Sequence, residues 1–197
     1  MPAIVPIVEG QSEEESVPIL LRWLLDHWQT YDIQVARPFR VKRTQVVREG
    51  ELERAVQQAV RDREDAAALL VLLDADNDCP ADLVSRLLQR ASRATNLPVA
   101  VVLARMEFEA WFLGAKESLR GNRGIRKDAA SPPDPEAVAG AKERLSRNMD
   151  RQRYLEVDDQ PAFAQAFDID AASKRCPSFD RFVRKVRSLV EGIHSRR

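Results

Sequence analysis

The chain has 197 residues, 44% of them hydrophobic and 31% charged, and its 31 Lys and Arg balance its 31 Asp and Glu. A chain of this length can build one complete hydrophobic core, so we expect a single domain with room for a small appended part. The zero net charge neither favours nor excludes nucleic acid as a partner. No apolar run reaches the roughly 18 residues of a membrane span, and the N-terminus lacks the pattern of a signal peptide. We therefore expect a cytoplasmic protein without a membrane anchor.

Cysteine and histidine are too scarce for the sites that they usually build. The two cysteines, Cys79 and Cys176, lie far apart, and neither His27 nor His194 belongs to a motif with metal-ligand spacing. The sequence therefore argues against a thiolate metal cluster, a disulfide framework and histidine-based catalysis.

The first half of the chain alternates apolar runs with amphipathic segments. Short continuous apolar runs predict buried strands, and apolar residues at helical spacing predict helices between them. The order is βαβαβαβ, which predicts an α/β fold with a parallel four-stranded sheet flanked by helices. The strands are expected at residues 3–8, 31–47 (one strand or an interrupted pair), 67–73 and 98–104, and the helices at 17–28, 50–60 and 83–91.

The second half of the chain is predicted to be helical. A short aromatic helix is expected at residues 106–113, and a connection rich in Gly, Pro and Arg follows it. We therefore divide the chain into an α/β core at 1–115 and a helical extension at 116–197 that packs on the core as part of a single structural unit. The further helices are expected at 136–147, 161–167 and 179–193.

Acidic residues follow three of the four predicted strands. Ligands of parallel sheets bind beyond the carboxyl ends of the strands, so we expect these side chains to meet there. So many carboxylates need a compensating cation, and oxygen ligands without His or Cys favour Mg²⁺ or Mn²⁺. In a helix, Glu107 and Glu109 would lie on nearly opposite sides, so at most one of them faces that site. The acidic residues are Glu9, Asp74, Asp76, Asp78, Glu107 and Glu109.

The order of these pieces resembles the Toprim domain, the metal-binding core of topoisomerases, primases and overcoming-lysogenization-defect nucleases. The resemblance is carried by Val8–Glu13, with its Glu-Gly turn, and by Leu73–Asp76, with its Asp-x-Asp motif. The segment Glu107–Leu113 is similar to a Phe-Glu-x-Trp motif of Toprim-like proteins found beside ATPases in bacterial defence loci. The whole chain, including Ser178-Phe179 before the last helix, resembles the domain of unknown function 4276 family. This resemblance implies a Toprim-like, Rossmann-like fold.

The resemblance also implies roles for particular carboxylates. Glu9 would be a metal ligand or a general acid/base, and Asp74 and Asp76 would hold the metal. Glu13 and Glu109 would be additional ligands, as in Toprim nucleases with two ions. In phosphodiester hydrolysis, one ion activates water and another stabilises the leaving oxygen.

Further residues are candidates for supporting the site or for contacting phosphate. Asp78 has a spacing that suits support of the metal ligands, and Glu107 lies beside the aromatic motif. Arg105 and Lys116 are the cations nearest to the motifs in sequence. Candidates for contacts with substrate phosphates are Arg37, Arg40, Arg43, Arg105 and Arg123.

The leading functional hypothesis is a Mg²⁺- or Mn²⁺-dependent phosphodiesterase, a nuclease effector of a bacterial anti-phage or toxin system with DNA or tRNA as substrate. No GxxxxGK[ST] motif occurs, so nucleotide-driven control would come from a separate ATPase of the AAA or ABC type. One alternative is a non-catalytic module that docks a partner through its acidic edge and Phe108, Trp111 and Phe112. Another is a phosphohydrolase of small molecules. A homo-oligomer is compatible with all three.

Overall fold

A computed structural model describes residues 1–76, 79–150 and 153–196 of the chain. Within these residues, five parallel strands form one sheet in the order β2-β1-β4-β5, and β3 also pairs with β1. The register places Ile7 beside Val71 and Asp74 beside Ala104, so β1, β4 and β5 end along one edge of the sheet. The strands are β1 (Ala3–Val8), β2 (Gln34–Val35), β3 (Phe39–Arg40), β4 (Ala66–Asp74) and β5 (Val99–Ala104).

The predicted α/β class with a parallel sheet flanked by helices is confirmed, but the predicted number of strands is wrong. The segment expected as the second strand forms two strands of two residues each, so the described sheet has five strands rather than four. Pro38 lies between them and has no N–H to donate to a ladder, which explains the interruption.

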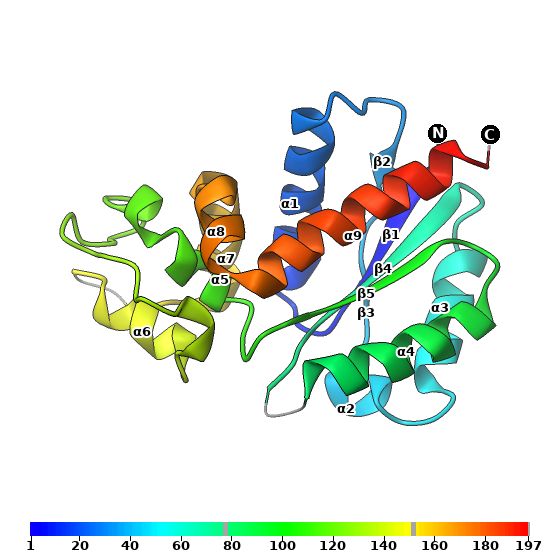
Figure 1. Cartoon of the computed structure of the whole chain (residues 1–197), viewed down its shortest axis with the longest axis horizontal. Helices are drawn as coiled ribbons and strands as arrows, with labels where there is room; N and C mark the ends of the chain where they lie inside the picture. Colours follow the sequence, from blue (N-terminus) through cyan, green and yellow to red (C-terminus); the bar gives the residue numbers. More distant parts are fainter. Residues whose placement is uncertain (77–78, 151–152, 197) are drawn as a thin grey trace.

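Helices cover both faces of the sheet (Figure 1), and none of those described is long and apolar enough to cross a membrane. The helices are α1 (Glu13–His27), α2 (Arg43–Val46), α3 (Glu51–Arg61), α4 (Pro80–Ala94), α5 (Ala110–Gly114), α6 (Ala141–Arg147), α7 (Glu156–Ala166), α8 (Ile169–Arg175) and α9 (Pro177–His194), with 3-10 turns η1 (Lys116–Leu119) and η2 (Pro135–Ala137).

Alternating side chains of the central strands enter two separate cores. Ile4 and Leu70 belong to the core that α1 and α9 cover, whereas Val5 and Val71 belong to the core that α3 and α4 cover. A strand buried on both faces needs apolar residues at every position, which is why β1, β4 and β5 read as continuous apolar runs. Figure 1 shows α5 to α8 gathered beyond the carboxyl ends of these strands, at the left of the view.

The aromatic segment after β5 is part of the core. Phe108, Trp111 and Phe112 are at most 1% exposed. The Trp111 Nε1–H donates to Ser178 Oγ at 2.8 Å, and the buried Glu136 carboxylate accepts a hydrogen bond from the Ser178 backbone N–H at 2.9 Å. These bonds tie α5 to the first turn of α9. The three aromatic side chains therefore offer no docking surface in this conformation.

The extension after residue 115 contacts the sheet and its helices directly. α9, from the end of the chain, packs on β4 and β5, and α7 packs on α1. The predicted helix at 161–167 begins earlier, at Glu156, and the stretch from Glu136 to Arg147 contains a 3-10 turn and the short α6. The division of the chain at residue 115 stays a prediction.

Candidate functional site

Four carboxylates meet beyond the carboxyl ends of the central strands. The pKa of Asp74 is raised well above its usual range, first by burial and then by the negative charges of the other three. Repulsion of this kind requires each of the other three side chains to lie near Asp74. We call this group the carboxylate cluster. It consists of Glu9 directly after β1, Glu13 at the start of α1, Asp74 at the end of β4 and Glu109 just before α5.

Burial is the main reason why these groups resist ionisation. The pKa of Glu9 is raised from 4.5 to about 7 by burial and next by repulsion from Glu13. Burial also raises the pKa of Glu109 to about 7, although the positive charge of Lys142 opposes the shift. The pKa of Glu13 is raised by burial as well. At neutral pH the cluster therefore carries less than its full negative charge unless a cation joins it.

Three oxygens of the cluster are buried without a hydrogen-bond partner among the described residues. They are one carboxylate oxygen each of Glu9, Glu13 and Glu109, in each case Oε2. A buried carboxylate oxygen without a donor is costly, and native proteins rarely leave one so. Hard divalent cations prefer this kind of oxygen ligand. The donors of the cluster therefore fit Mg²⁺ or Mn²⁺ in their chemistry.

The positions of these donors do not yet form a metal cage. Within residues 1–76, 79–150 and 153–196, no three Asp, Glu, His or Cys side chains stand in an arrangement that could hold an ion. Binding of an ion would therefore require a rearrangement of these side chains.

Two donors from the extension hold Glu109. The Tyr154 hydroxyl and the Gln160 amide both donate to Glu109 Oε1, at 3.0 and 3.1 Å. Because both hydrogen bonds end on Oε1, Glu109 Oε2 stays available for another ligand. The start of α7 is fixed in turn by the buried Asp159, which forms an ion pair with Arg123 at 2.8 Å. Arg123, predicted to contact phosphate, thus supports the segment that orients Glu109.

The turn after β1 brings Glu13 against the backbone. A Cβ added at Gly10 would lie 2.0 Å from Glu13 Oε2, a distance that atoms in proteins do not adopt. Only glycine therefore allows the Glu13 side chain to fold back over the turn. The helix α1 begins at Glu13, ahead of the apolar positions from Val17 onward on which its prediction rested, and includes Pro18. This early start places Glu13 beside Glu9.

The two predicted Asp-x-Asp carboxylates point to different partners. Asp74 Oδ1 accepts a hydrogen bond from the Phe108 backbone N–H at 2.8 Å, which keeps Asp74 in the cluster. Asp76 has a left-handed backbone, with φ of 48°, and forms an ion pair with Arg43 Nε at 2.9 Å. Arg43 also donates to the backbone carbonyls of Asp74 and Ala75. Asp76 therefore pairs with Arg43, although its negative charge still contributes to the raised pKa of Glu9. Asp78 lies outside the described residues.

Glu107 and Lys142 are linked through the start of α6, and Lys142 interacts with the carboxylate cluster. Glu107 accepts hydrogen bonds from the backbone N–H groups of Ala141 and Lys142, both at 3.3 Å, and so caps the start of α6. This cap fixes the helix that carries Lys142. The Lys142 ammonium pairs with Glu156 at 2.9 Å, and attraction to Glu109 and to other acids raises the pKa of Lys142. Lys142 is therefore a cation that the cluster already attracts.

A family model described as a domain of unknown function, DUF4276, matches residues 8–187. The chain belongs to the DUF4276 family. The matched segment contains the whole carboxylate cluster and also Lys142, Tyr154 and Gln160. No curated protein and no solved structure matches the chain.

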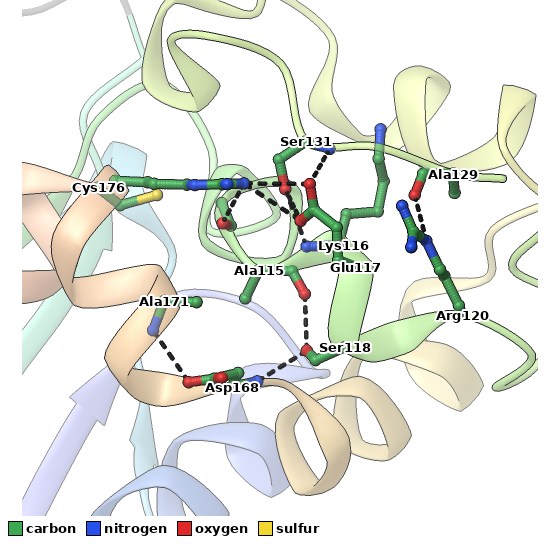
Figure 2. A network of polar contacts seen from close by, with 12 residues as sticks. Ala115, Lys116, Glu117, Ser118, Arg120, Ala129, Ser131, Asp168, Ala171 and Cys176 are labelled. Atoms are coloured by element: carbon green, nitrogen blue, oxygen red, sulfur yellow. Dashed lines mark hydrogen bonds and ion pairs between the residues drawn. The ribbon is translucent and has the colours of Figure 1, made fainter. Parts of the chain in front are cut away.

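Lys116 of this DUF4276 chain lies in a different polar cluster from the carboxylates (Figure 2). Its neighbour Glu117 accepts hydrogen bonds from Ser131 and Arg175. Lys116 is buried, its Nζ has no hydrogen-bond partner among the described residues, and burial and then repulsion from Arg144 lower its pKa. None of the four clustered carboxylates contributes to that shift. Lys116 is therefore not the cation of the carboxylate cluster.

The remaining predicted phosphate contacts of the DUF4276 chain are spread over its surface. Arg40 lies 3.7 Å from Glu14, on the turn of α1 next to Glu13. Arg37 and Arg105 are exposed, and Arg105 uses its backbone N–H to donate to Ser178 Oγ at 3.3 Å. Of these three, Arg40 is the one whose ion pair reaches the start of α1.

A cleft of about 640 Å³ lies between the start of α1 and the extension, and its described lining residues include none of the four clustered carboxylates. Its walls include Gln11-Ser12, between Glu9 and Glu13, and Lys142 and Tyr154 from the extension. Tyr154 donates to Glu109, and Lys142 is attracted to it. A molecule in the cleft of this DUF4276 chain would therefore contact two residues that in turn interact with Glu109.

Sequence reasoning missed Lys142, Tyr154 and Gln160. All three lie in the extension, more than thirty residues from the motifs with which they interact, and no local pattern marks them. Tyr154 gives the one weak signal, because the chain has only 2 tyrosines and a buried phenol needs a hydrogen-bond partner.

Proposed function

We propose that this DUF4276 chain is a Toprim-like, Mg²⁺- or Mn²⁺-dependent phosphodiesterase, and specifically a nuclease. The observation that carries the proposal is the set of buried, unpartnered oxygens of Glu9, Glu13 and Glu109 beside Asp74, at the carboxyl edge of a parallel sheet. Burying these oxygens without a partner lowers the folding stability of the metal-free protein. The same oxygens suit a hard cation whose other ligands come from a phosphodiester.

In this proposal, the clustered carboxylates bind the ion and Glu9 also transfers a proton. Glu9, Glu13, Asp74 and Glu109 would hold the ion. A bound ion of this class supplies Lewis-acid polarisation of the phosphodiester and a water molecule of lowered pKa. Glu9, with its pKa of about 7, is suited to accept or return a proton at neutral pH.

Two cations would complete the site. Lys142 lines the cleft and would meet the negative charge of an entering phosphate, which competes with Glu156 for its ammonium. Arg43 would hold the end of β4 through its bonds to the Asp74 and Ala75 carbonyls. For Asp76 to serve as a metal ligand, its carboxylate would have to leave Arg43.

The biological setting of the proposal rests on the resemblance of the motifs to Toprim-like proteins of defence loci. We propose a cytoplasmic effector of an anti-phage or toxin system that cleaves DNA or tRNA and is controlled by a separate AAA- or ABC-type ATPase. The chain itself has no GxxxxGK[ST] motif with which to bind nucleotide in that way.

Metal-dependent cleavage tests the proposal directly. Purified protein is incubated with end-labelled DNA or tRNA, with Mn²⁺ or with EDTA, alone and with a candidate partner ATPase. We expect cleavage that requires Mn²⁺ and falls at least about a hundredfold in Asp74→Asn and Glu109→Gln. Asp170→Asn, an exposed acid of α8, is the matched control and should cleave as the wild type does. No Mn²⁺-dependent cleavage under any condition, together with no heat of Mn²⁺ binding, would reject the enzyme.

A further inference from the structure

The cleft beside the carboxylate cluster has an apolar wall that the metal chemistry does not use. Leu155 and Val157 line it, with exposed fractions of 53% and 52%. Single exposed aliphatic residues are common, but two of them on one wall of a cleft indicate a surface for the apolar face of a ligand. The wall is held in place, because the Leu155 backbone N–H donates to the buried Asp159 carboxylate at 2.8 Å.

The described charged groups around this wall include free carboxylates. Among the described residues of the lining, the acids are Glu143, Glu156 and Asp158 and the bases are Lys142 and Arg153. Lys142 pairs with Glu156, which leaves the carboxylates of Glu143 and Asp158 to accept hydrogen bonds. Carboxylates accept hydrogen bonds from exocyclic amines and ring N–H groups, whereas they repel phosphates. The cleft therefore fits a flat apolar ring whose edge carries N–H donors.

The size and position of the cleft agree with that chemistry. Its volume of about 640 Å³ lies within the usual range of small-ligand sites and accommodates one nucleoside. On one side of the cleft, Lys142 and Tyr154 both interact with Glu109 of the carboxylate cluster, where the phosphodiester would lie. A base placed on Leu155 and Val157 would thus belong to a nucleotide next to the phosphate that is cleaved.

We propose that this cleft binds one unpaired nucleobase, so that the substrate of the enzyme is single-stranded nucleic acid. This inference rests on the proposed function for the neighbouring phosphodiester, and it adds the class of substrate. In a duplex, both faces of a base are stacked on its neighbours and its pairing edge is hydrogen-bonded to the other strand. Such a base cannot enter a cleft that contacts one face and the pairing edge of its ligand. A single strand presents both without the cost of unpairing.

Binding without metal tests the inference separately from catalysis. A fluorescein-labelled single-stranded oligonucleotide and the same strand in a blunt duplex are titrated with protein in EDTA, and fluorescence anisotropy is measured. We expect the single strand to bind about tenfold more tightly than the duplex. In Leu155→Ser/Val157→Ser the single strand should lose about tenfold in affinity, and the duplex should bind as before. Equal binding of both forms by the wild type, or unchanged single-strand binding by the variant, overturns the inference.

Two controls make the result specific. Val47→Ser removes an aliphatic side chain that is 44% exposed outside the cleft, and it should leave single-strand binding unchanged. Mn²⁺-dependent cleavage of bis(p-nitrophenyl) phosphate, a diester without a base, should be the same in the wild type and in Leu155→Ser/Val157→Ser. Cleavage of this diester with no preference for single strands would refute the cleft inference alone. A single-strand preference lost in the cleft variant, with no metal-dependent cleavage, would refute the nuclease and leave the cleft as a base-binding site.

Discussion

Glu9 and Glu109 have pKa values of about 7, above the value of 4.5 for a free glutamate side chain. A raised pKa means that the folded state holds these protons more tightly than the unfolded state does. Their contribution to stability is therefore fully present below about pH 4.5 and is lost as the pH rises to about 7. For the buried Glu109 the loss is roughly 3 kcal/mol as an upper limit.

We accordingly expect the metal-free protein to lose thermal stability between pH 5 and 8, and Mg²⁺ to restore part of it at the upper end, where the carboxylates are ionised. Melting temperatures followed by circular dichroism across this range check the slope. Glu9→Gln/Glu109→Gln should flatten it, because neither amide titrates. A wild-type slope in this double variant would show that other groups cause the pH dependence.

Tyr154 is a positioning residue, since it reaches the site through Glu109. Removing its hydroxyl in Tyr154→Phe should cost about 1 kcal/mol of folding stability, the usual value of one hydrogen bond. It should also weaken Mn²⁺ binding about threefold to tenfold, because Glu109 Oε1 loses one of its two donors. Isothermal titration calorimetry measures the affinity. Tyr31→Phe, on a side chain that is 70% exposed, is the control and should change neither quantity.

At the level of secondary structure, the turn between β1 and α1 needs glycine at position 10 to leave room for the Glu13 side chain. In Gly10→Ala the new Cβ would displace Glu13, from which it would lie 2.0 Å, so we expect Mn²⁺ affinity to fall about tenfold. A double-mutant cycle identifies the cause. If the effect passes through Glu13, then Gly10→Ala has little further effect in a Glu13→Ala background. Additive losses of affinity would place the effect in the turn itself.

The elements that could be predicted are those whose sequences carry their own signal. β1, β4 and β5 are buried on both faces, so their apolar runs mark them and the acids that end them. The segment at 31–47 left one strand or an interrupted pair open, because Pro38 and two short pairings leave little pattern, and the structure shows the pair. The ion pair between Asp76 and Arg43 could not be predicted from the sequence either. It depends on the left-handed backbone conformation of Asp76, which no local pattern indicates.

The complete candidate site is formed by residues from both the α/β part of the chain and the extension. Glu9, Asp74 and Glu109 follow strand ends and Glu13 was implied by the resemblance, whereas Lys142, Tyr154 and Gln160 come from the extension and meet Glu109 only through tertiary packing. Long-range hydrogen bonds of this kind leave no periodicity in a sequence. The clustered acids could therefore be named from the sequence, their binding of a metal stays a prediction, and the residues that orient them could not be named.

Removal of the extension tests whether the chain is a single structural unit. Residues 1–115 alone would lack α9, so Leu70 and Val102 would lose the helix that covers their face of the sheet. We expect this fragment to show no cooperative urea unfolding by circular dichroism, whereas the full chain should unfold in one transition. A cooperative transition of residues 1–115 would instead establish an independent α/β domain.

The position of α9 at Pro177–His194 has a consequence for how the protein matures on the ribosome. One face of the central strands is completed by a helix that is translated after all four clustered acids, so the nascent polypeptide holds these acids before that face can close. Folding must then wait for contacts that are distant along the chain, which is slow. The proposed nuclease would therefore stay inactive until α9 has been translated and has packed.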